Sequence, residues 1–321
     1  MKKIAVFTSG GDSPGMNACV RAVVRSGIYY GMKVMGVTRG YNGLIDGDIK
    51  PLTAQSVANI VQRGGTILKT ARSKEFMTPE GRKKAYDNLK KHGVEGIVCI
   101  GGDGTFTGAK IFFEEYGIPC MGAPGTIDND LYGTDYTIGF DTAINTAIDA
   151  IDKIRDTADS HDRVFFVEVM GRNSGAIALE VAIGGGAEAV MLPEVSGEVG
   201  PLKEMFNNRK RKKSFSIIVV AEGNEEGGAY KIADELKQAF PEIDARVTIL
   251  GHIQRGGSPT AYDRVLATRL GAACVEGLLK GETNKMAAIV NNQVTLVSFD
   301  DAINKTKELP DILGLIDLMN V

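Results

Sequence analysis

Two carboxylates and a threonine are crowded into one short segment, Pro124-Gly-Thr-Ile-Asp-Asn-Asp130. Asp128 and Asp130 stand two residues apart, and nearby carboxylates repel each other unless a cation or a proton-transfer role stabilises the arrangement. A local turn would account for one aspartate but hardly for both. Transfer of a phosphoryl group to an alcohol needs a base for the hydroxyl proton and a metal for the charge on the transferring group. The segment therefore predicts phosphoryl transfer, with Asp128 as the base.

A second acidic segment is the glycine-rich run Gly101-Gly-Asp-Gly-Thr105, which follows a short apolar stretch. An aspartate flanked by glycines at a strand end is accessible, and proteins usually hold Mg2+ with one or two carboxylates together with substrate phosphates. Asp103 is therefore a candidate metal ligand. Taken alone, the pattern is equally typical of an aspartate that caps the next helix, which we expect to begin near Phe106.

The first glycine loop, Ser9-Gly-Gly-Asp-Ser-Pro-Gly-Met-Asn17, stands between an apolar run and an expected helix that extends to about Tyr30. Ser13 followed by Pro14 is typical of an N-cap and a first-turn proline. A glycine loop at a helix N-terminus offers N–H groups and the positive end of the helix dipole to a phosphate. The loop has no GxxxxGK[ST] lysine, and no GxGxxG follows any expected strand, so it is neither a P-loop nor a dinucleotide fingerprint.

Short apolar runs alternate with helical stretches along the chain. We expect strands at residues 4–8, 34–38, 94–100, 164–170, 215–221 and 286–290. Such alternation is typical of βαβ units and of mainly parallel sheets buried beneath helices on both faces. Ligands of these folds bind at the carboxyl ends of the strands, where the glycine loops stand. The clearest helix is 142–158, whose apolar residues recur at helical spacing and which Asp141 is expected to cap.

The size and charge of the chain limit its class. Its 321 residues, of which 43% are hydrophobic, predict about two domains. A formal net charge of -3 gives no general attraction to nucleic acid or anionic membranes, so we expect neither as a partner. The four cysteines form no CxxC pair, which favours reduced thiols and a cytoplasmic location. No signal-like segment and no run of about 18 apolar residues occurs, so neither secretion nor membrane insertion is expected.

Five motifs together resemble the bacterial ATP-dependent 6-phosphofructokinase family, in order from residue 1 to about residue 275. They are Gly10-Gly-Asp-Ser-Pro-Gly-Met-Asn17, Gly101-Gly-Asp-Gly-Thr105, Pro124-Gly-Thr-Ile-Asp-Asn-Asp130, Met170-Gly-Arg172 and Gly251-His-Ile-Gln-Arg-Gly-Gly-Ser-Pro259. The resemblance implies an α/β fold of two similar Rossmann-like three-layer domains with mainly parallel sheets and the active site in the cleft between them. A larger ATP-binding domain would comprise residues 1–138 and 251–301, and a smaller fructose 6-phosphate-binding domain residues 139–250 and 302–321.

The implied reaction moves the γ-phosphoryl group of ATP to the 1-hydroxyl of fructose 6-phosphate, a step of glycolysis. By similarity, Asp103 would bind Mg2+, Asp128 would be the base, and the transfer would be assisted by Thr126, Arg172 and Arg72. The nucleotide would be held by Gly11, Tyr41, Arg72, Ser73, Gly102, Asp103, Gly104, Thr105 and Gly108. The sugar phosphate would be held by Thr126, Asp128, Arg163, Met170, Gly171, Arg172, Glu222, Arg246, His252 and Arg255, of which Arg163 and Arg246 would come from a neighbouring subunit.

Family members are typically homotetramers whose active and effector sites are shared between subunits. The effectors ADP and phosphoenolpyruvate would bind at residues matching Arg21, Arg25, Arg155, Gly186, Glu188, Arg211 and Lys213. Without the resemblance, a solvated basic surface is the default interpretation of Arg21 and Arg25, one helical turn apart, and of the cationic run 209–213. Some relatives carry a further arginine within the segment 52–57, where this chain has no cation.

The phosphoryl donor and two other functions are addressed by particular residues. Pyrophosphate-dependent relatives typically carry Asp where this chain has Gly104 and Lys where it has Gly125, so glycine at both positions predicts ATP. The alternatives are another kinase built on the GGDGT motif, such as an NAD or lipid kinase, and a catalytically silent nucleotide-binding sensor subunit. The arginine set favours a substrate that already carries phosphate, and a silent subunit would be expected to have lost Asp103 or Asp128.

Overall fold

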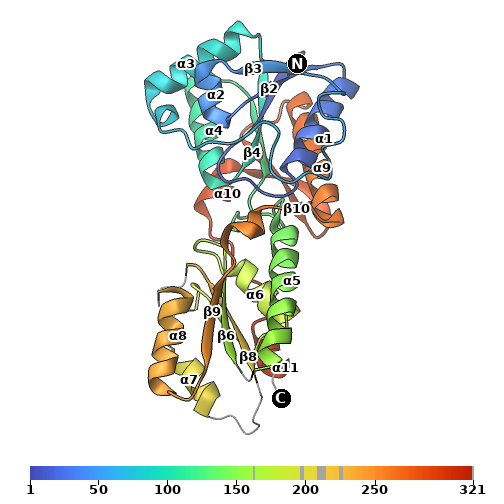
Figure 1. The fold of residues 1–321 in the computed structure, drawn as a ribbon. Helices are drawn as coiled ribbons and strands as arrows, with labels where there is room; N and C mark the ends of the chain where they lie inside the picture. The colour runs from blue at the N-terminus through green and yellow to red at the C-terminus, as the bar shows by residue number, and fades with distance from the viewer. Residues whose placement is uncertain (162, 196–198, 208–214, 224–226, 320–321) are drawn as a thin grey trace. The chain divides into compact units, whose positions relative to one another are not determined.

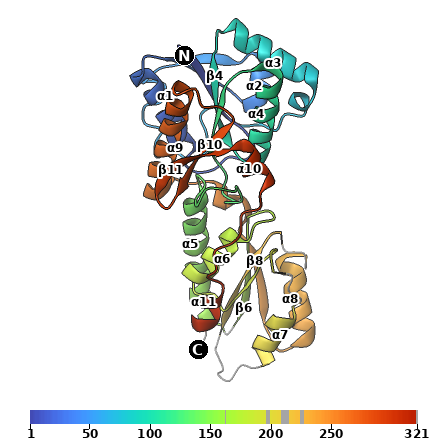
Figure 2. The same ribbon diagram turned by 180° about the vertical axis from the view of Figure 1, so that it is seen from behind.

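A computed structural model describes the chain except for residues 162, 196–198, 208–214, 224–226 and 320–321. The chain divides into two compact units, drawn in Figures 1 and 2. The first unit comprises Met1–Ile127, Leu131–Thr142 and Arg255–Lys307, and the second comprises Asp128–Asp130, Ala143–Gln254 and Glu308–Val321. The domain limits were expected at residues 138, 250 and 301, whereas the units change at residues 142, 254 and 307. Asp128–Asp130 also group with the second unit, although they were expected in the first domain.

The first unit is built on a seven-stranded sheet with the order β11-β10-β5-β4-β1-β2-β3. The five central strands run parallel, while the edge strands β3 and β11 pair antiparallel with their neighbours. The strands are β1 (Lys3–Thr8), β2 (Lys33–Val37), β3 (Ile49–Leu52), β4 (Gly96–Gly101), β5 (Cys120–Pro124), β10 (Lys285–Val290) and β11 (Gln293–Ser298).

Helices cover both faces of this sheet, as Figure 1 shows. One face is covered by α1 (Met16–Tyr29) and α9 (Ala261–Leu279), and the other by α2 (Gly40–Asp46), α3 (Pro79–Lys91), α4 (Asp103–Tyr116) and α10 (Phe299–Asn304), with the short 3-10 helix η1 (Glu75–Met77) beside them. Because successive strand side chains point to opposite faces, Ile4 and Val6 join the core under α1 and α9, whereas Ala5 and Phe7 join the core under α2, α3 and α4. Both faces of the central strands are therefore buried, which explains their continuous apolar sequences.

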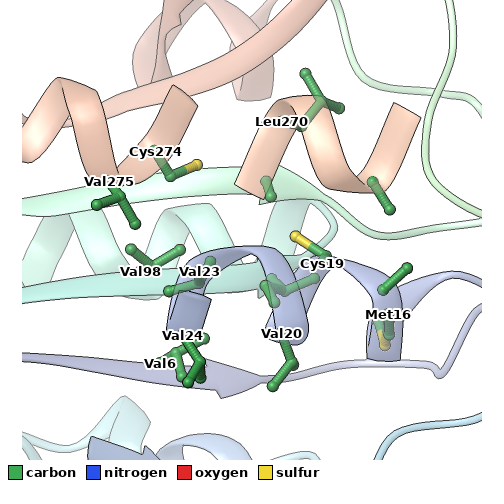
Figure 3. Packing of buried hydrophobic residues seen from close by; sticks show 14 of the residues in the cluster. Val6, Met16, Cys19, Val20, Val23, Val24, Val98, Leu270, Cys274 and Val275 are labelled. Carbon is green, nitrogen blue, oxygen red and sulfur yellow. The ribbon is translucent and has the colours of Figure 1, made fainter. Parts of the chain in front are cut away.

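All four cysteines are free and lie in these two cores. Figure 3 shows Cys19 on α1 and Cys274 on α9 among the apolar side chains of the first core. Burial raises the pKa of the Cys120 and Cys274 thiols to about 12, and it also raises the pKa of Cys19 and Cys99. The thiols are therefore protonated and unreactive at neutral pH.

The second unit contains a four-stranded, fully parallel sheet with the order β7-β8-β6-β9. Its strands are β6 (Val164–Val169), β7 (Ala189–Met191), β8 (Ser216–Ala221) and β9 (Ala245–Ile249). One face packs on α7 (Gly200–Asn207) and α8 (Gly228–Ala239), and the other faces α6 (Ala176–Gly184) and α5 (Phe140–Asp159), as Figure 2 shows. The short helices η2 (Gly251–Arg255) and α11 (Gly314–Met319) complete the elements. No helix among the described residues is long and apolar enough to cross a membrane.

Each expected strand is present, but three helix starts differ from the expectation. The helix α1 begins at Met16 with Gly15 at its N-cap in the left-handed conformation (φ 106°), so Ser13 is not the cap. The helix α4 begins at Asp103 instead of near Phe106, directly after the extended Gly102. The helix α5 begins before Thr142, which places Asp141 inside the first turn instead of at the cap.

Candidate active site

Three loops meet at the carboxyl ends of β1, β4 and β5, which are neighbours in the first sheet. The N–H of Ser9 donates to Ile100 O at 3.0 Å, and the N–H of Gly125 donates to Gly101 O at 3.0 Å. A methyl group built on Gly102 would lie 3.8 Å from Cβ of Thr126, which is ordinary contact. The structure thus brings the first glycine loop, the GGDGT loop and the start of the acidic loop together, as expected for strand ends of a parallel sheet.

Gly104 and Gly125 have opposite surroundings. A Cβ built on Gly104 meets no atom within 4 Å, so the space in front of the GGDGT loop is open. A Cβ on Gly125 would lie 3.0 Å from both Ile100 and Met16, which are buried in the first core. Gly104 therefore leaves room for a ligand, while Gly125 also has a packing reason to be glycine, which the sequence did not reveal.

Tyr41 joins α2 to the GGDGT loop. Its buried hydroxyl donates to Thr105 O at 2.5 Å, and burial raises the pKa of this phenol well above its usual value. The ring stacks on Phe76 with centroids 3.9 Å apart, and a Cβ on Gly108 would lie 3.0 Å from the ring. Three of the residues expected near the nucleotide, Tyr41, Thr105 and Gly108, are therefore adjacent.

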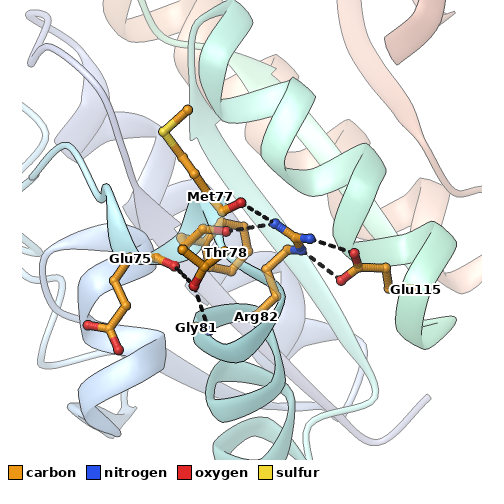
Figure 4. A network of polar contacts seen from close by, with 7 residues as sticks. Glu75, Met77, Thr78, Gly81, Arg82 and Glu115 are labelled. Carbon is orange, nitrogen blue, oxygen red and sulfur yellow. Dashed lines mark hydrogen bonds and ion pairs between the residues drawn. The ribbon is translucent and has the colours of Figure 1, made fainter.

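The turn that follows Arg72 and Ser73 is held by Arg82, whose role the sequence did not indicate. Arg82 on α3 bonds both carboxylate oxygens of Glu115 on α4, at 2.7 and 2.6 Å, and donates to Phe76 O and Met77 O at 3.1 and 2.8 Å (Figure 4). Bidentate pairing of this kind fixes geometry as well as charge. The guanidinium thus ties η1 and its aromatic contact with α2 to the helix that begins at Asp103.

The guanidinium of Arg255 lies against the first glycine loop. A Cβ built on Gly11 would be 2.5 Å from Nη1 of Arg255, so the pair is in close contact only because residue 11 is glycine. Nε of Arg255 is buried and has no hydrogen-bond partner among the described residues. A residue expected to contact ATP and one expected to contact the sugar phosphate are therefore neighbours.

In the second unit, Asp128 faces Arg172. The Asp128 side chain is 5% exposed and its Oδ2 lies 3.5 Å from Nε of Arg172, whose side chain is 45% exposed. Arg172 and Asn129 both adopt left-handed backbone conformations, at φ 52° and 51°. Such conformations cost energy for non-glycine residues and concentrate at functional sites.

The conformation of Arg172 is supported by Glu222. One oxygen of the Glu222 carboxylate accepts from the N–H groups of Gly171 and Arg172, at 3.3 and 2.8 Å. The next residue must be small, because a Cβ on Gly223 would lie 1.8 Å from Arg172 O. Glu222 is thus a support for this turn, whatever it does for the sugar.

Arg163 and Arg246 meet on one carboxylate, that of Asp244. Arg163 Nε donates to Oδ2 at 2.9 Å, and Arg246 Nη2 lies 3.0 Å from Oδ1. The hydrogen bond from Arg163 is the main reason why the pKa of Asp244 lies below its usual value. The sequence predicted both arginines but missed Asp244. His252 is exposed on η2, and Met170 donates its N–H to Gln254 Oε1 at 2.9 Å.

The sequence profile of the phosphofructokinase family matches residues 3–278. The chain belongs to the phosphofructokinase family. Over its whole length it is 56% identical to a protein of Cytophaga hutchinsonii named ATP-dependent 6-phosphofructokinase, 98% of which is covered. A Thermus thermophilus protein named ATP-dependent 6-phosphofructokinase 1 is 56% identical over 96% of both chains.

Solved phosphofructokinases share the fold. The phosphofructokinase of Saccharomyces cerevisiae has a TM-score of 0.88 at 37% identity, and the match covers 100% of this chain but only 47% of the yeast chain. A pyrophosphate-dependent phosphofructokinase of Marinobacter aquaeolei has a TM-score of 0.85 over 97% of this chain and 86% of its own, and at 23% identity that likeness concerns the fold alone.

The sequence relatives confirm the predicted activity. The chain has ATP-dependent 6-phosphofructokinase activity: it transfers the γ-phosphoryl group of ATP to the 1-hydroxyl of fructose 6-phosphate, which yields fructose 1,6-bisphosphate and ADP. The named relatives are ATP-dependent, as their names state. The rival kinases and the silent sensor subunit are thereby set aside.

The residues of this phosphofructokinase that were expected to bind effectors lie in both units. Arg21 and Arg25 project from α1 in the first unit. In the second unit Arg155 donates to the carbonyl oxygens of Gly185 and Gly186, the latter at 2.9 Å, which satisfies the end of α6. Glu188 Oε2 accepts from Ile217 N–H at 2.7 Å. Arg211 and Lys213 lie outside the described residues.

Proposed function

We propose that Asp128 is the general base of this phosphofructokinase and that Arg172 binds the transferring phosphoryl group. The observation that supports this is the 3.5 Å approach of the Arg172 guanidinium to a carboxylate that is almost fully buried. A base takes the proton of the 1-hydroxyl as the phosphoryl group arrives, and a neighbouring guanidinium stabilises the charge spread over the phosphoryl oxygens. Thr126 would contact the same group from the loop that Gly102 touches, and Arg72 would assist from the nucleotide side.

Mg2+ fits the residues of the GGDGT loop. Asp103 is exposed in the first turn of α4, beside the open space in front of Gly104. No group of three or more candidate ligand side chains occurs among the described residues, which suits a cation held by one carboxylate and the phosphates of ATP. The ion would neutralise the negative charge of the phosphates. Gly11, Tyr41, Ser73, Thr105 and Gly108 would complete the nucleotide site.

We further propose a subunit arrangement for the sugar phosphate. Arg255, His252, Met170, Gly171 and Glu222 would bind it from one subunit, and Arg163 and Arg246 would bind it from a neighbour in a homotetramer. The pairing of the last two with Asp244 supports joint action, because it presents two guanidinium groups side by side, one from the residue before β6 and one from the neighbouring strand β9. ADP and phosphoenolpyruvate would regulate the enzyme through the effector residues, in the cytoplasm.

The decisive experiment is a coupled assay of purified protein with fructose 6-phosphate and either MgATP or pyrophosphate. We expect turnover with MgATP alone. Asp128→Ser should lower kcat by about 10²-fold to 10⁴-fold, the usual contribution of a general base, while the enzyme still binds fructose 6-phosphate. Asp149→Ser is the matched control, because Asp149 is an exposed carboxylate of α5 that pairs with Lys153. Turnover of Asp128→Ser within twofold of the control would remove the proposed base.

A further inference from the structure

The carboxylate of Asp263 is fully buried near the start of α9 and accepts three hydrogen bonds from the start of α5. The N–H of Gly139 donates to Oδ1 at 2.8 Å, and the N–H and hydroxyl of Thr142 donate to Oδ2 at 2.8 and 2.5 Å. A helix leaves its first N–H groups without intrahelical partners, so this carboxylate supplies hydrogen-bond acceptors at the start of α5. The carboxylate that was expected from Asp141 thus comes from a residue far along the chain.

The start of α9 is held in return. Thr260 caps α9 by accepting from the N–H of Asp263 at 3.2 Å. Its own N–H donates to the hydroxyl of Thr142 at 3.1 Å, and its hydroxyl donates to Asp141 at 2.5 Å. The two helix starts therefore fix each other, and every one of these residues belongs to the first unit.

The residues just before α5 hold the backbone of the acidic loop. Ile138 N–H donates to Pro124 O at 2.8 Å, and the Thr137 hydroxyl donates to Thr126 O at 2.7 Å. Gly125 forms an isolated parallel bridge with Ile138 between these two bonds. The segment 137–142 therefore links the Asp263 carboxylate to the three residues that begin the acidic loop.

The same segment also packs against the first glycine loop. A Cβ built on Gly139 would lie 2.6 Å from Cβ of Ser13, and a Cβ on Gly15 would lie 2.7 Å from the Ile138 side chain. Both glycines have positive φ, at 104° and 106°, so neither position suits a larger residue. Two loops of the active site thus rest on one segment.

We propose that Asp263 is a positioning residue for phosphoryl transfer, which fixes the segment 137–142 against the acidic loop at Pro124–Thr126 and against the first glycine loop. The inference rests on the proposed catalytic role of the acidic loop. Burial raises the pKa of Asp263 to about 6, so at pH 7.5 the carboxylate is ionised and both oxygens accept. If Asp263 were only a helix cap, its loss would lower stability and leave the turnover of folded enzyme unchanged.

The test is Asp263→Asn, which keeps the side-chain shape but turns an NH2 group toward an N–H donor. A small misplacement of reacting groups can cost about 10²-fold in rate. We expect kcat at pH 7.5 to fall by about 10-fold to 100-fold, with KM for MgATP and fructose 6-phosphate changed less than about threefold. Ser298→Ala is the matched control, because it removes the hydroxyl that caps α10 in the same unit at 3.0 Å from Asp301 N. It should leave kcat unchanged.

Hydrogen exchange of the folded variants gives a readout that does not depend on activity. Peptides covering residues 124–142 should exchange several-fold faster in Asp263→Asn than in wild type, and peptides covering β10 and β11 should not change. Equal kcat and equal exchange in Asp263→Asn and Ser298→Ala would overturn the proposal.

If Asp263→Asn does not fold, Thr142→Val is the deciding variant, since it removes one donor to Asp263. Unchanged kcat and unchanged exchange in Thr142→Val would likewise overturn the proposal. Faster exchange with unchanged kcat would overturn the role in transfer, and full turnover of Asp128→Ser would point instead to failure of the proposed base.

Discussion

Oδ2 of Asp128 lies 3.5 Å from Nε of Arg172, and both residues belong to the second unit. The aspartate is buried, while the arginine is half exposed on a left-handed backbone that Glu222 supports. If Asp128 is the base and Arg172 the phosphoryl ligand, as proposed above, side chains this close act on one transition state.

The first prediction is that these two side chains are not independent. Asp128→Asn and Arg172→Ala should each lower kcat by about 10²-fold or more, and the double variant should be about as impaired as the worse single variant. The measurement is a double-mutant cycle on kcat at saturating substrates. Multiplicative losses would contradict a joint role.

The second prediction concerns the contact of Gly11 with Arg255. Gly11→Ala should displace the guanidinium, because the added methyl group would lie 2.5 Å from Nη1. We expect the fructose 6-phosphate concentration for half-maximal rate to rise about 10-fold, the loss of one charge-assisted contact of about 1.5 kcal/mol. Initial-rate kinetics would measure this. The double variant Gly11→Ala/Arg255→Ala should need little more fructose 6-phosphate for its half-maximal rate than Gly11→Ala alone. An unchanged fructose 6-phosphate response would show that Arg255 relocates without loss.

The third prediction separates two glycines of the phosphate loops. Gly125→Ala should lower the free energy of unfolding by about 1 to 3 kcal/mol, because its Cβ would press on Ile100 and Met16 in the core. Gly104→Ala lies in open space within α4 and should leave stability unchanged or raise it by up to about 1 kcal/mol. Urea unfolding curves of both variants would check this, and equal losses would contradict the difference in packing.

The strands that the sequence predicted are buried on both of their faces. In β4 and β8 every residue is buried, so β4 and residues 217–221 of β8 form unbroken runs of apolar residues and glycine. The edge strands β3, β9 and β11 are partly exposed and their polar residues hide the pattern. In β5 the strand was concealed by Gly122 and Pro124, which usually interrupt strands. Gly122 is required by packing, because a Cβ on it would lie only 2.4 Å from Phe106.

The candidate site was predictable where its residues are contiguous. The glycine and aspartate loops carry their chemistry within five to nine letters, and parallel strand ends bring them together. Asp263, Asp244 and Arg82 were missed because each has a partner that is distant in sequence. Gly139 is 124 positions from Asp263, Arg163 is 81 positions from Asp244, and Glu115 is 33 positions from Arg82. No local pattern distinguishes such a carboxylate from a solvated one.

The fourth prediction is a pH dependence of stability. Burial raises the pKa of Asp263 from 3.8 to about 6, so the folded state binds a proton at this carboxyl group more tightly than the unfolded state does. That contribution is complete below about pH 4 and is lost as the pH rises through about 6, an effect of about 3 kcal/mol over the full window. Between pH 5 and 7.5, wild type should lose about 1 kcal/mol of unfolding free energy relative to Asp263→Asn. Urea unfolding at both pH values measures the difference, and parallel curves would contradict it.

Because its native thiols are buried, this enzyme is suited to spectroscopy with a probe attached at one chosen site. All four cysteines are enclosed in the two cores of the first unit, and the sequence has no tryptophan. A maleimide dye at neutral pH should therefore leave the folded native chain unlabelled, since the reagent needs an accessible thiolate. One cysteine introduced at exposed Ala54, or one tryptophan in place of the exposed Tyr29, would then report on a single chosen place in the enzyme against no thiol or tryptophan background.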